Sequence, residues 1–202
     1  MTAIAEADEC VLRWITNLVG ELALLDSFMM VVVNDYFIPV SLSLMLVGLW
    51  FAGKDRGRRE YNQRIAICAG IAIGLANAFI AICNLFYNRP RPFVYIPELM
   101  ANVERIFYAP TDSSFPSNMA AVVFSIAVAV WISNRKLGLL LCIPAFLVCF
   151  ARVFAGVHYP LDILAGAGIG ILSAYLAQDV VMPIIEPLIR SGLKLARRVR
   201  IA

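Results

Sequence analysis

Five long apolar runs constrain the fold of this chain more than any other feature of its sequence. A helix needs about 20 residues to cross the hydrocarbon of a bilayer. The two shorter runs reach that length only by taking in a flank, Ser117 for one and residues 151–155 for the other. Only 15% of the residues are charged, against about 25% in a soluble domain. We therefore expect an all-α, polytopic membrane protein with about five transmembrane helices and one domain, residues 1–202. The runs are residues 35–53, 65–86, 119–132, 137–150 and 161–188.

The N-terminal segment, residues 1–34, differs from these runs because apolar and polar residues alternate in it. Between residues 10 and 30, leucine and isoleucine recur at helical spacing, which is typical of an amphipathic helix. Acidic residues stand where a secretory signal would be basic. We expect an interfacial helix on the outer side of the membrane, anchored by Trp14.

The basic residues predict the orientation. Twelve of the seventeen fall in two connections and in the tail, residues 189–202, and the positive-inside rule makes that side cytoplasmic. Basic clusters beside a membrane bind anionic lipid, so we expect membrane lipids, and no nucleic acid, as partners there. The twelve are Lys54, Arg56, Arg58, Arg59, Arg64, Arg135, Lys136, Arg190, Lys194, Arg197, Arg198 and Arg200.

The long connection at residues 87–116 is predicted to lie on the outer face. A loop of that length within a compact domain is usually functional. It contains Arg89 and Arg91, each followed by a proline, which stiffens the backbone. We expect both guanidinium groups to bind phosphate, Arg89 reaching a second phosphate of a diphosphate.

The start of the third apolar run is a candidate anion cradle. Pro116 and Ser117 are favoured at helix starts, where the first backbone N–H groups have no partner within the helix and carry partial positive charge. We therefore expect Ser117 and Asn118 to help bind an oxyanion.

The only histidine, His158, lies where the fourth run ends and the fifth begins. Asp162 follows one helical turn later, so its carboxylate can accept from one imidazole nitrogen and leave the other as a nucleophile. Arg152 precedes His158 at membrane depth, where charges usually mark function. Oriented imidazole, arginine clamp and helix start together predict phosphoryl transfer.

Other motifs predict no cofactor and no metal. The five cysteines are scattered without metal-ligand spacing. Gly166, Gly168 and Gly170 lie inside an apolar helix with no strand before it, which favours close helix packing over a nucleotide-binding loop.

These stretches resemble the three motifs of the type 2 phosphatidic acid phosphatase family. The third motif is Ser-Arg, five residues, His, three residues, Asp, and here it reads Ala151-Arg152, then His158 and Asp162. The first motif ends on Arg91-Pro92 and the second begins Pro116-Ser117. The resemblance implies metal-independent hydrolysis of a lipid phosphate through a phosphohistidine on His158.

Two departures affect the expected substrate. Asn84 stands where the family has a phosphate-binding lysine, and Met119 where it has the histidine that protonates the leaving group. Asn84 can still donate a hydrogen bond to phosphate. A leaving phosphate, with a second pKa near 6, can depart unprotonated, whereas a lipid alkoxide needs an acid. We therefore expect a polyprenyl diphosphate to be favoured. This preference would be lost if a water or Asp112 replaced the missing acid.

Two alternatives stay open at this point. The chain can be a non-catalytic lipid-phosphate binder or accessory subunit, which would explain the missing lysine and histidine. It can also be a phosphotransferase that passes the phosphoryl group to a lipid or sugar instead of water. The sequence does not fix whether the chain forms a homo-oligomer.

Overall fold

The computed structural model describes residues 3–198, and every regular element in that range is a helix. The expected all-α fold is therefore confirmed. A 3₁₀ turn, η1 (Pro97–Leu99), precedes α6, and a π-helical segment, η2 (Ala177–Val181), joins α9 to α10. The α-helices are α1 (Ala3–Thr16), α2 (Ala23–Val33), α3 (Phe37–Phe51), α4 (Arg56–Phe86), α5 (Pro92–Tyr95), α6 (Met100–Ile106), α7 (Asn118–Ser133), α8 (Arg135–Phe154), α9 (Pro160–Leu176) and α10 (Met182–Arg198).

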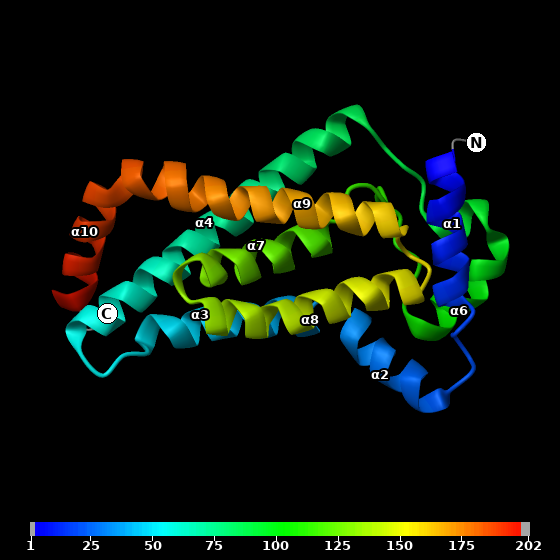
Figure 1. Ribbon diagram of the computed structural model, residues 1–202, viewed down its shortest axis with the longest axis horizontal. Helices are drawn as coiled ribbons and strands as arrows, with labels where there is room; N and C mark the ends of the chain where they lie inside the picture. Colours follow the sequence, from blue (N-terminus) through cyan, green and yellow to red (C-terminus); the bar gives the residue numbers. More distant parts are fainter. Residues whose placement is uncertain (1–2, 199–202) are drawn as a thin grey trace.

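Helix α7 is the centre of the bundle, with α4, α8 and α9 packed along it (Figure 1). It has 16 residues and is therefore about 24 Å long, short of the roughly 30 Å of a hydrocarbon core. The expectation that this run reaches spanning length by including Ser117 is wrong, because Ser117 is the N-cap of α7 and Asn134 already caps α8.

Glycine lets α9 approach α7 closely. A Cβ atom added at Gly166 would lie 2.2 Å from the carbonyl oxygen of Ser117, and one at Gly170 would lie 2.4 Å from that of Ala121. Gly168 has open space around it. The predicted close packing is therefore confirmed for two of the three glycines, and it holds the start of α7 against the start of α9.

Three stretches of the described chain are long and apolar enough to cross a membrane: α4, α8 and residues Pro160–Leu193. Helices α2 and α3 qualify only as a pair, bent by 53° at residues 34–36. The predicted run at residues 35–53 is thus the second arm of a bent pair, and its partner arm comes from the segment expected to lie in the interface.

The expected single amphipathic helix over residues 10–30 is wrong, because residues 17–22 break it into α1 and α2. Gly20 lies in the left-handed region at φ +91°, and its N–H donates to both carboxylate oxygens of Asp26 at 3.2 Å. Figure 1 shows the result: α1 runs across one end of the bundle, while α2 leads into α3.

The two ends of the bundle carry different elements (Figure 1). The α3–α4 and α7–α8 connections and α10 lie at one end, and α1 and α6 lie at the other. The predicted cytoplasmic basic residues therefore gather at one end; Arg200 lies outside the described residues. Residues 87–116 reach the opposite end and fold into α5, η1 and α6, which Asn102 ties to α1 by donating to the carbonyl of Thr16 at 3.1 Å.

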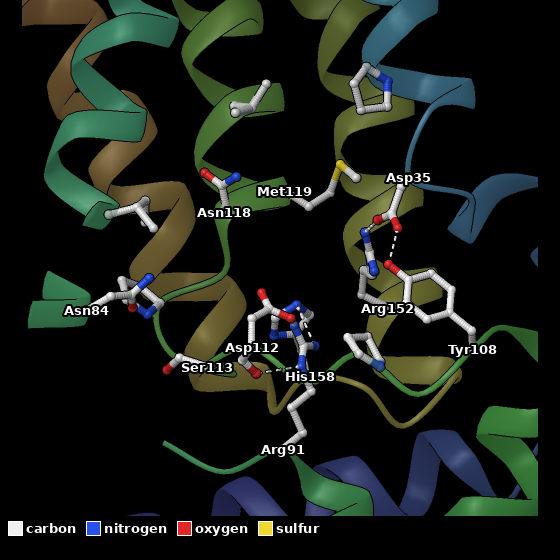
Figure 2. A pocket seen from close by; sticks show the side chains of 15 residues that line it. Asp35, Asn84, Arg91, Tyr108, Asp112, Ser113, Asn118, Met119, Arg152 and His158 are labelled. Carbon is white, nitrogen blue, oxygen red and sulfur yellow. Dashed lines mark hydrogen bonds and ion pairs between the residues drawn. The ribbon is translucent and has the colours of Figure 1, made fainter. Parts of the chain in front are cut away.

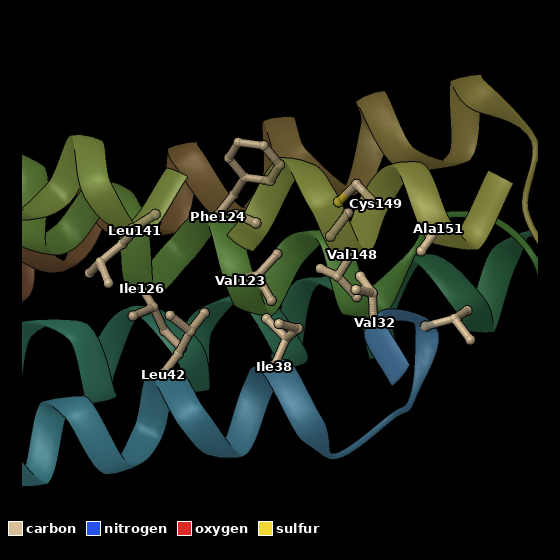
Figure 3. Close-up of a cluster of buried hydrophobic side chains, with 14 of the residues drawn as sticks. Val32, Ile38, Leu42, Val123, Phe124, Ile126, Leu141, Val148, Cys149 and Ala151 are labelled. Atoms are coloured by element: carbon tan, nitrogen blue, oxygen red, sulfur yellow. The ribbon is translucent and has the colours of Figure 1, made fainter. Parts of the chain in front are cut away.

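Buried aliphatic side chains hold the bent pair against the bundle (Figure 3). Val32 of α2 and Ile38 and Leu42 of α3 lie in one cluster with Val123 of α7 and Val148 of α8. Val123 and Val148 are fully buried. Within a membrane such contacts stabilise the fold through close van der Waals packing, and they fix the bend at residues 34–36 beside the helix starts described next.

Candidate active site

A cavity of about 310 Å³ opens between α3, α4, α7 and the end of α8 (Figure 2). Residues of the long connection 87–116 close it from the side of α1. One wall is apolar, and the rest carries polar or charged groups. The apolar wall consists of Pro39, Ile80, Met119 and Val122. The polar lining consists of Asp35, Asn84, Arg91, Tyr108, Asp112, Ser113, Asn118, Arg152 and His158.

His158 lies in the turn from α8 to α9, where Gly156 at φ +77° reverses the chain. Its Nδ1 is 2.9 Å from the carbonyl oxygen of Ser114. Because a carbonyl can only accept, Nδ1 carries the proton and Nε2 has the free electron pair. Nε2 lies 3.4 Å from Nη1 of Arg91. Burial, with the charges of Arg91 and Arg152, lowers the pKa of His158, which favours the neutral, nucleophilic ring.

Asp162 lies farther from the imidazole than we predicted. Its Oδ2 is 3.8 Å from Nδ1 of His158, too long for a hydrogen bond, because the Ser114 carbonyl occupies that position. Oδ2 instead accepts from the hydroxyl of Ser114 at 2.5 Å and from the backbone N–H of Tyr159 at 2.9 Å. The fully buried carboxylate therefore orients His158 through Ser114.

Arg91 and Arg152 both line the cavity, as expected of phosphate-binding residues. Arg91 donates to the carbonyl of Val157 at 2.8 Å and is bonded to both the backbone and the carboxylate of Asp112. Arg152 is paired with Asp35, and its Nε is the one fully buried side-chain polar atom of the described chain without a partner.

Arg89 does not lie where we expected it. It is absent from the cavity lining, and its two terminal nitrogens donate to Asp162 at 2.7 Å and to Asp8 of α1 at 3.0 Å. The structure thus contradicts the prediction that Arg89 reaches a second phosphate, because two carboxylates already occupy its donors.

The start of α7 is divided between structural and cavity-facing groups. Ser117 is fully buried and does not line the cavity. Its side chain caps Ala120, and its N–H donates to the backbone carbonyl of Asp162 at 3.0 Å, so its expected phosphate contact is wrong. Asn118 and Met119 do line the cavity. Among the described residues, their backbone N–H groups have no acceptor, so the expected oxyanion cradle is reduced to these two groups.

Both departures from the family motifs lie at the cavity. Asn84, near the end of α4, is exposed, and its side chain makes no hydrogen bond within the described chain. The side chain of Met119 points toward Asp35 (Figure 2). Neither residue supplies charge or a proton to the cavity.

Sequence reasoning missed three residues of the site. Ser114 joins Asp162 to His158. Asp35 pairs with Arg152 and also accepts from the hydroxyl of Tyr108 at 2.5 Å, which raises the pKa of Tyr108 to about 12, together with burial. Ser114 stands only two residues before Pro116 in the sequence, but only the fold brings Asp35 and Tyr108 to Arg152. No group of three or more His, Cys, Asp or Glu side chains in residues 3–198 has the arrangement of a metal site.

Comparison with known proteins agrees with this geometry. The PAP2 superfamily matches residues 65–184, more than half of the chain and all three motifs. Undecaprenyl-diphosphatase BcrC of Bacillus subtilis (strain 168) is 31% identical over 172 residues, covering 83% of this chain and 82% of that protein. The bacitracin transport permease protein BcrC of Bacillus licheniformis is 35% identical over 133 residues, 66% of this chain, but the match spans only 61% of that relative's length.

A solved structure shares the fold. The crystal structure of Aquifex aeolicus LpxE superimposes with a TM-score of 0.61 at 24% identity, over 84% of this chain and 93% of that one. Family match, fold and motif positions thus agree, and the chain belongs to the PAP2 superfamily, the type 2 phosphatidic acid phosphatase family that its motifs resemble.

Proposed function

We propose that this chain is a membrane lipid phosphatase that hydrolyses a polyprenyl diphosphate by means of His158. The observation that carries the proposal is the buried imidazole whose Nδ1 is bonded to Ser114 and whose Nε2 adjoins Arg91 at the cavity. A neutral nucleophile beside buried cations suits attack on an anionic phosphoryl group, because positioning and charge stabilisation supply most of the rate enhancement.

The reaction has two steps. The electron pair of His158 Nε2 attacks the terminal phosphorus and forms a P–N bond. The bond from that phosphorus to the bridging oxygen breaks, and the polyprenyl phosphate leaves with the electrons of the broken P–O bond. Water then attacks the phosphohistidine, the P–N bond breaks, and inorganic phosphate leaves. Arg91, Arg152 and the N–H groups of Asn118 and Met119 hold the non-bridging oxygens. Asn84 adds a neutral donor at the mouth of the cavity.

Met119 supports the choice of a diphosphate. A general acid typically contributes 10²–10⁴-fold, and the thioether of Met119 cannot supply a proton. Asp112 is a weak substitute, because its carboxylate is paired with Arg91 at 2.8 Å and its side chain is 75% exposed. Only a leaving group stable without protonation, such as a phosphate, tolerates this site. Two of the relatives carry matching names, the Bacillus subtilis protein and the undecaprenyl-diphosphatase of Sulfolobus acidocaldarius.

The proposed location is the cell membrane, with the active site on the outer face and the basic end in the cytoplasm. The basic connections lie at the end of the bundle opposite α1 and α6, and the cavity is lined by residues of the connection 87–116 that leads to α6. The positive-inside rule gives this orientation. The apolar wall of the cavity, with Pro39 and Val122, suits the first part of a hydrocarbon chain.

The test is phosphate release in detergent from a polyprenyl diphosphate and from phosphatidic acid, comparing the natural protein with His158→Ala. We expect release from the diphosphate to exceed release from the monoester, and both to vanish in the variant. Equal or faster turnover of phosphatidic acid would contradict the leaving-group argument. Lipid binding without release, unchanged in the variant, would favour a binding protein, and a phosphorylated lipid or sugar product would favour a phosphotransferase.

A further inference from the structure

Helix α1 contains a buried carboxylate that the mechanism above does not use. The side chain of Asp8 is 1% exposed, although burying a charge is costly unless it is paired. Its Oδ2 accepts from Nη2 of Arg89 at 3.0 Å, and its Oδ1 accepts from the backbone N–H of Leu161 at 2.9 Å. Asp8 thus connects α1 to two segments that adjoin His158.

The contact with Leu161 lies at the start of α9. The first N–H groups of a helix have no partner within it, and a carboxylate there is favoured by the helix dipole. Asp8 satisfies one of these donors from a separate helix, while Asp162 satisfies the N–H of Tyr159 from within α9. Two carboxylates therefore fix the turn that follows His158.

The contact with Arg89 extends to the imidazole. The planar guanidinium bridges two carboxylates, with Nη2 on Asp8 and Nη1 on Asp162 at 2.7 Å, and it stacks on the ring of Tyr159 at 3.7 Å. Asp162 in turn accepts from Ser114, whose carbonyl holds Nδ1 of His158. Every link in this series is a charged or hydrogen-bonded contact between buried or half-buried groups.

We propose that α1 is a positioning element of the active site, in which Asp8 acts through Arg89 to fix Asp162 and hence the direction of the His158 ring. The inference rests on the proposed function for its kinetic consequence, but the geometry that it assigns is independent of the substrate. Asp8 and Arg89 are positioning residues, since neither lines the cavity.

The substitution Asp8→Asn separates the two contacts of Asp8. The amide oxygen can still accept from Leu161, but the charge that balances Arg89 is gone. The chain also offers a matched control. Asp26 of α2 is likewise buried, pairs with Arg105 at 2.9 Å and accepts from Gly20, yet none of these residues contacts the cavity.

The experiment uses the full chain in detergent and a polyprenyl diphosphate, and it compares Asp8→Asn, Arg89→Ala, the double variant and Asp26→Asn. We expect kcat to fall about 10-fold in Asp8→Asn with KM nearly unchanged. Residues that orient a metal-bound histidine by hydrogen bonds contribute about 10–100-fold, and we take the lower end of that range because Asp8 acts indirectly. Because Asp8 acts through Arg89, the double variant should be no slower than Arg89→Ala. Asp26→Asn should lower the melting temperature and leave kcat unchanged.

A second measurement needs no activity. His158 is the only histidine, so its ring signals in a nitrogen NMR spectrum are unambiguous. We expect them to move in Asp8→Asn and to stay in place in Asp26→Asn. Unmoved ring signals, additive losses in the double variant or an equal loss of kcat in Asp26→Asn would each overturn the proposal. If the natural protein released no phosphate, the proposed function would fail, while the NMR comparison would still test the positioning.

Discussion

Both ends of the helical bundle carry arginines paired with carboxylates, and the pairs differ in burial. At the cavity, the side chains of Arg91 and Arg152 are 5% exposed. At the opposite end, those of Arg64 and Arg190 are 27% and 67% exposed. Buried pairs often cost more desolvation than their attraction returns, whereas exposed pairs contribute little either way. The burial of Arg91 and Arg152 at the cavity therefore calls for a functional explanation, which the more exposed arginines at the opposite end do not need.

The partners of the arginines differ as well. At the basic end, the carboxylate of Glu186 accepts from Arg64 of α4 and from Arg190, which lies one helical turn after it in α10. At the cavity, Arg152 pairs with Asp35 and keeps a buried Nε without a partner in the described chain. At the basic end the more exposed guanidinium groups are satisfied by Glu186, whereas at the cavity one buried guanidinium nitrogen has no acceptor in the described chain.

The largest effect should come from removing a buried cation at the cavity, compared with removing an exposed cation at the opposite end. Arg91→Ala should lower kcat/KM for the diphosphate by roughly 10²–10³-fold, the range found when a donor to a developing oxyanion is removed. Its control, Arg190→Ala, removes an exposed guanidinium at the opposite end and should leave kcat/KM unchanged. Similar losses in both variants would mean that burial does not separate the two ends functionally.

A smaller effect is expected at Ser114, which holds the carboxylate of Asp162. Ser114→Ala should lower kcat about 10-fold, because a buried carboxylate loses a donor while the Ser114 carbonyl still holds His158. Ser125→Ala is the matched control, since Ser125 is also fully buried but bonds only the carbonyl of Val122 within α7. Steady-state kinetics on both variants checks the prediction, and unchanged kcat in Ser114→Ala would contradict the indirect link to Asp162.

The helical fold and the proximity of Arg152, His158 and Asp162 could be predicted from sequence because both depend on local patterns. Apolar runs predicted the helices, and the spacing of Arg152, His158 and Asp162 predicted a common site. Arg89 and Arg91 show the limit. They are two residues apart with the same proline context, yet one lines the cavity and the other bridges two carboxylates. Which way a side chain turns depends on tertiary partners such as Asp8.

The same limit applies to the N-terminal segment. Its helical spacing was visible, but the break at residues 17–22 depends on a hydrogen bond from Gly20 to a buried Asp26. The bend that brings Asp35 to Arg152 likewise follows from the packing of α2 and α3 on α7 and α8. Neither contact leaves a periodic signal in the sequence.

The dependence of kcat/KM on pH tests whether His158, at the cavity end, is as buried as the structure indicates. Burial lowers the pKa of His158 below its ordinary value of 6.5, and only the neutral ring attacks. Activity should therefore stay at its plateau as the pH falls through 6.5 and decline only below it. Measuring kcat/KM from neutral to mildly acidic pH checks this, and a decline centred at or above 6.5 would contradict a buried, neutral imidazole.

The smallest effect is expected at the basic end. Glu186→Gln removes the carboxylate that accepts from Arg64 at 2.5 Å and from Arg190 at 2.7 Å. Because these pairs are partly exposed, salt screens them, and we expect a slightly lower melting temperature at low salt, no difference at high salt and unchanged kcat. A clear loss of kcat would connect the two ends. Two helical routes could carry such a loss: α4, which contains both Arg64 and the cavity residue Asn84, and the stretch from Pro160 to Leu193, which leads from Glu186 back to Asp162.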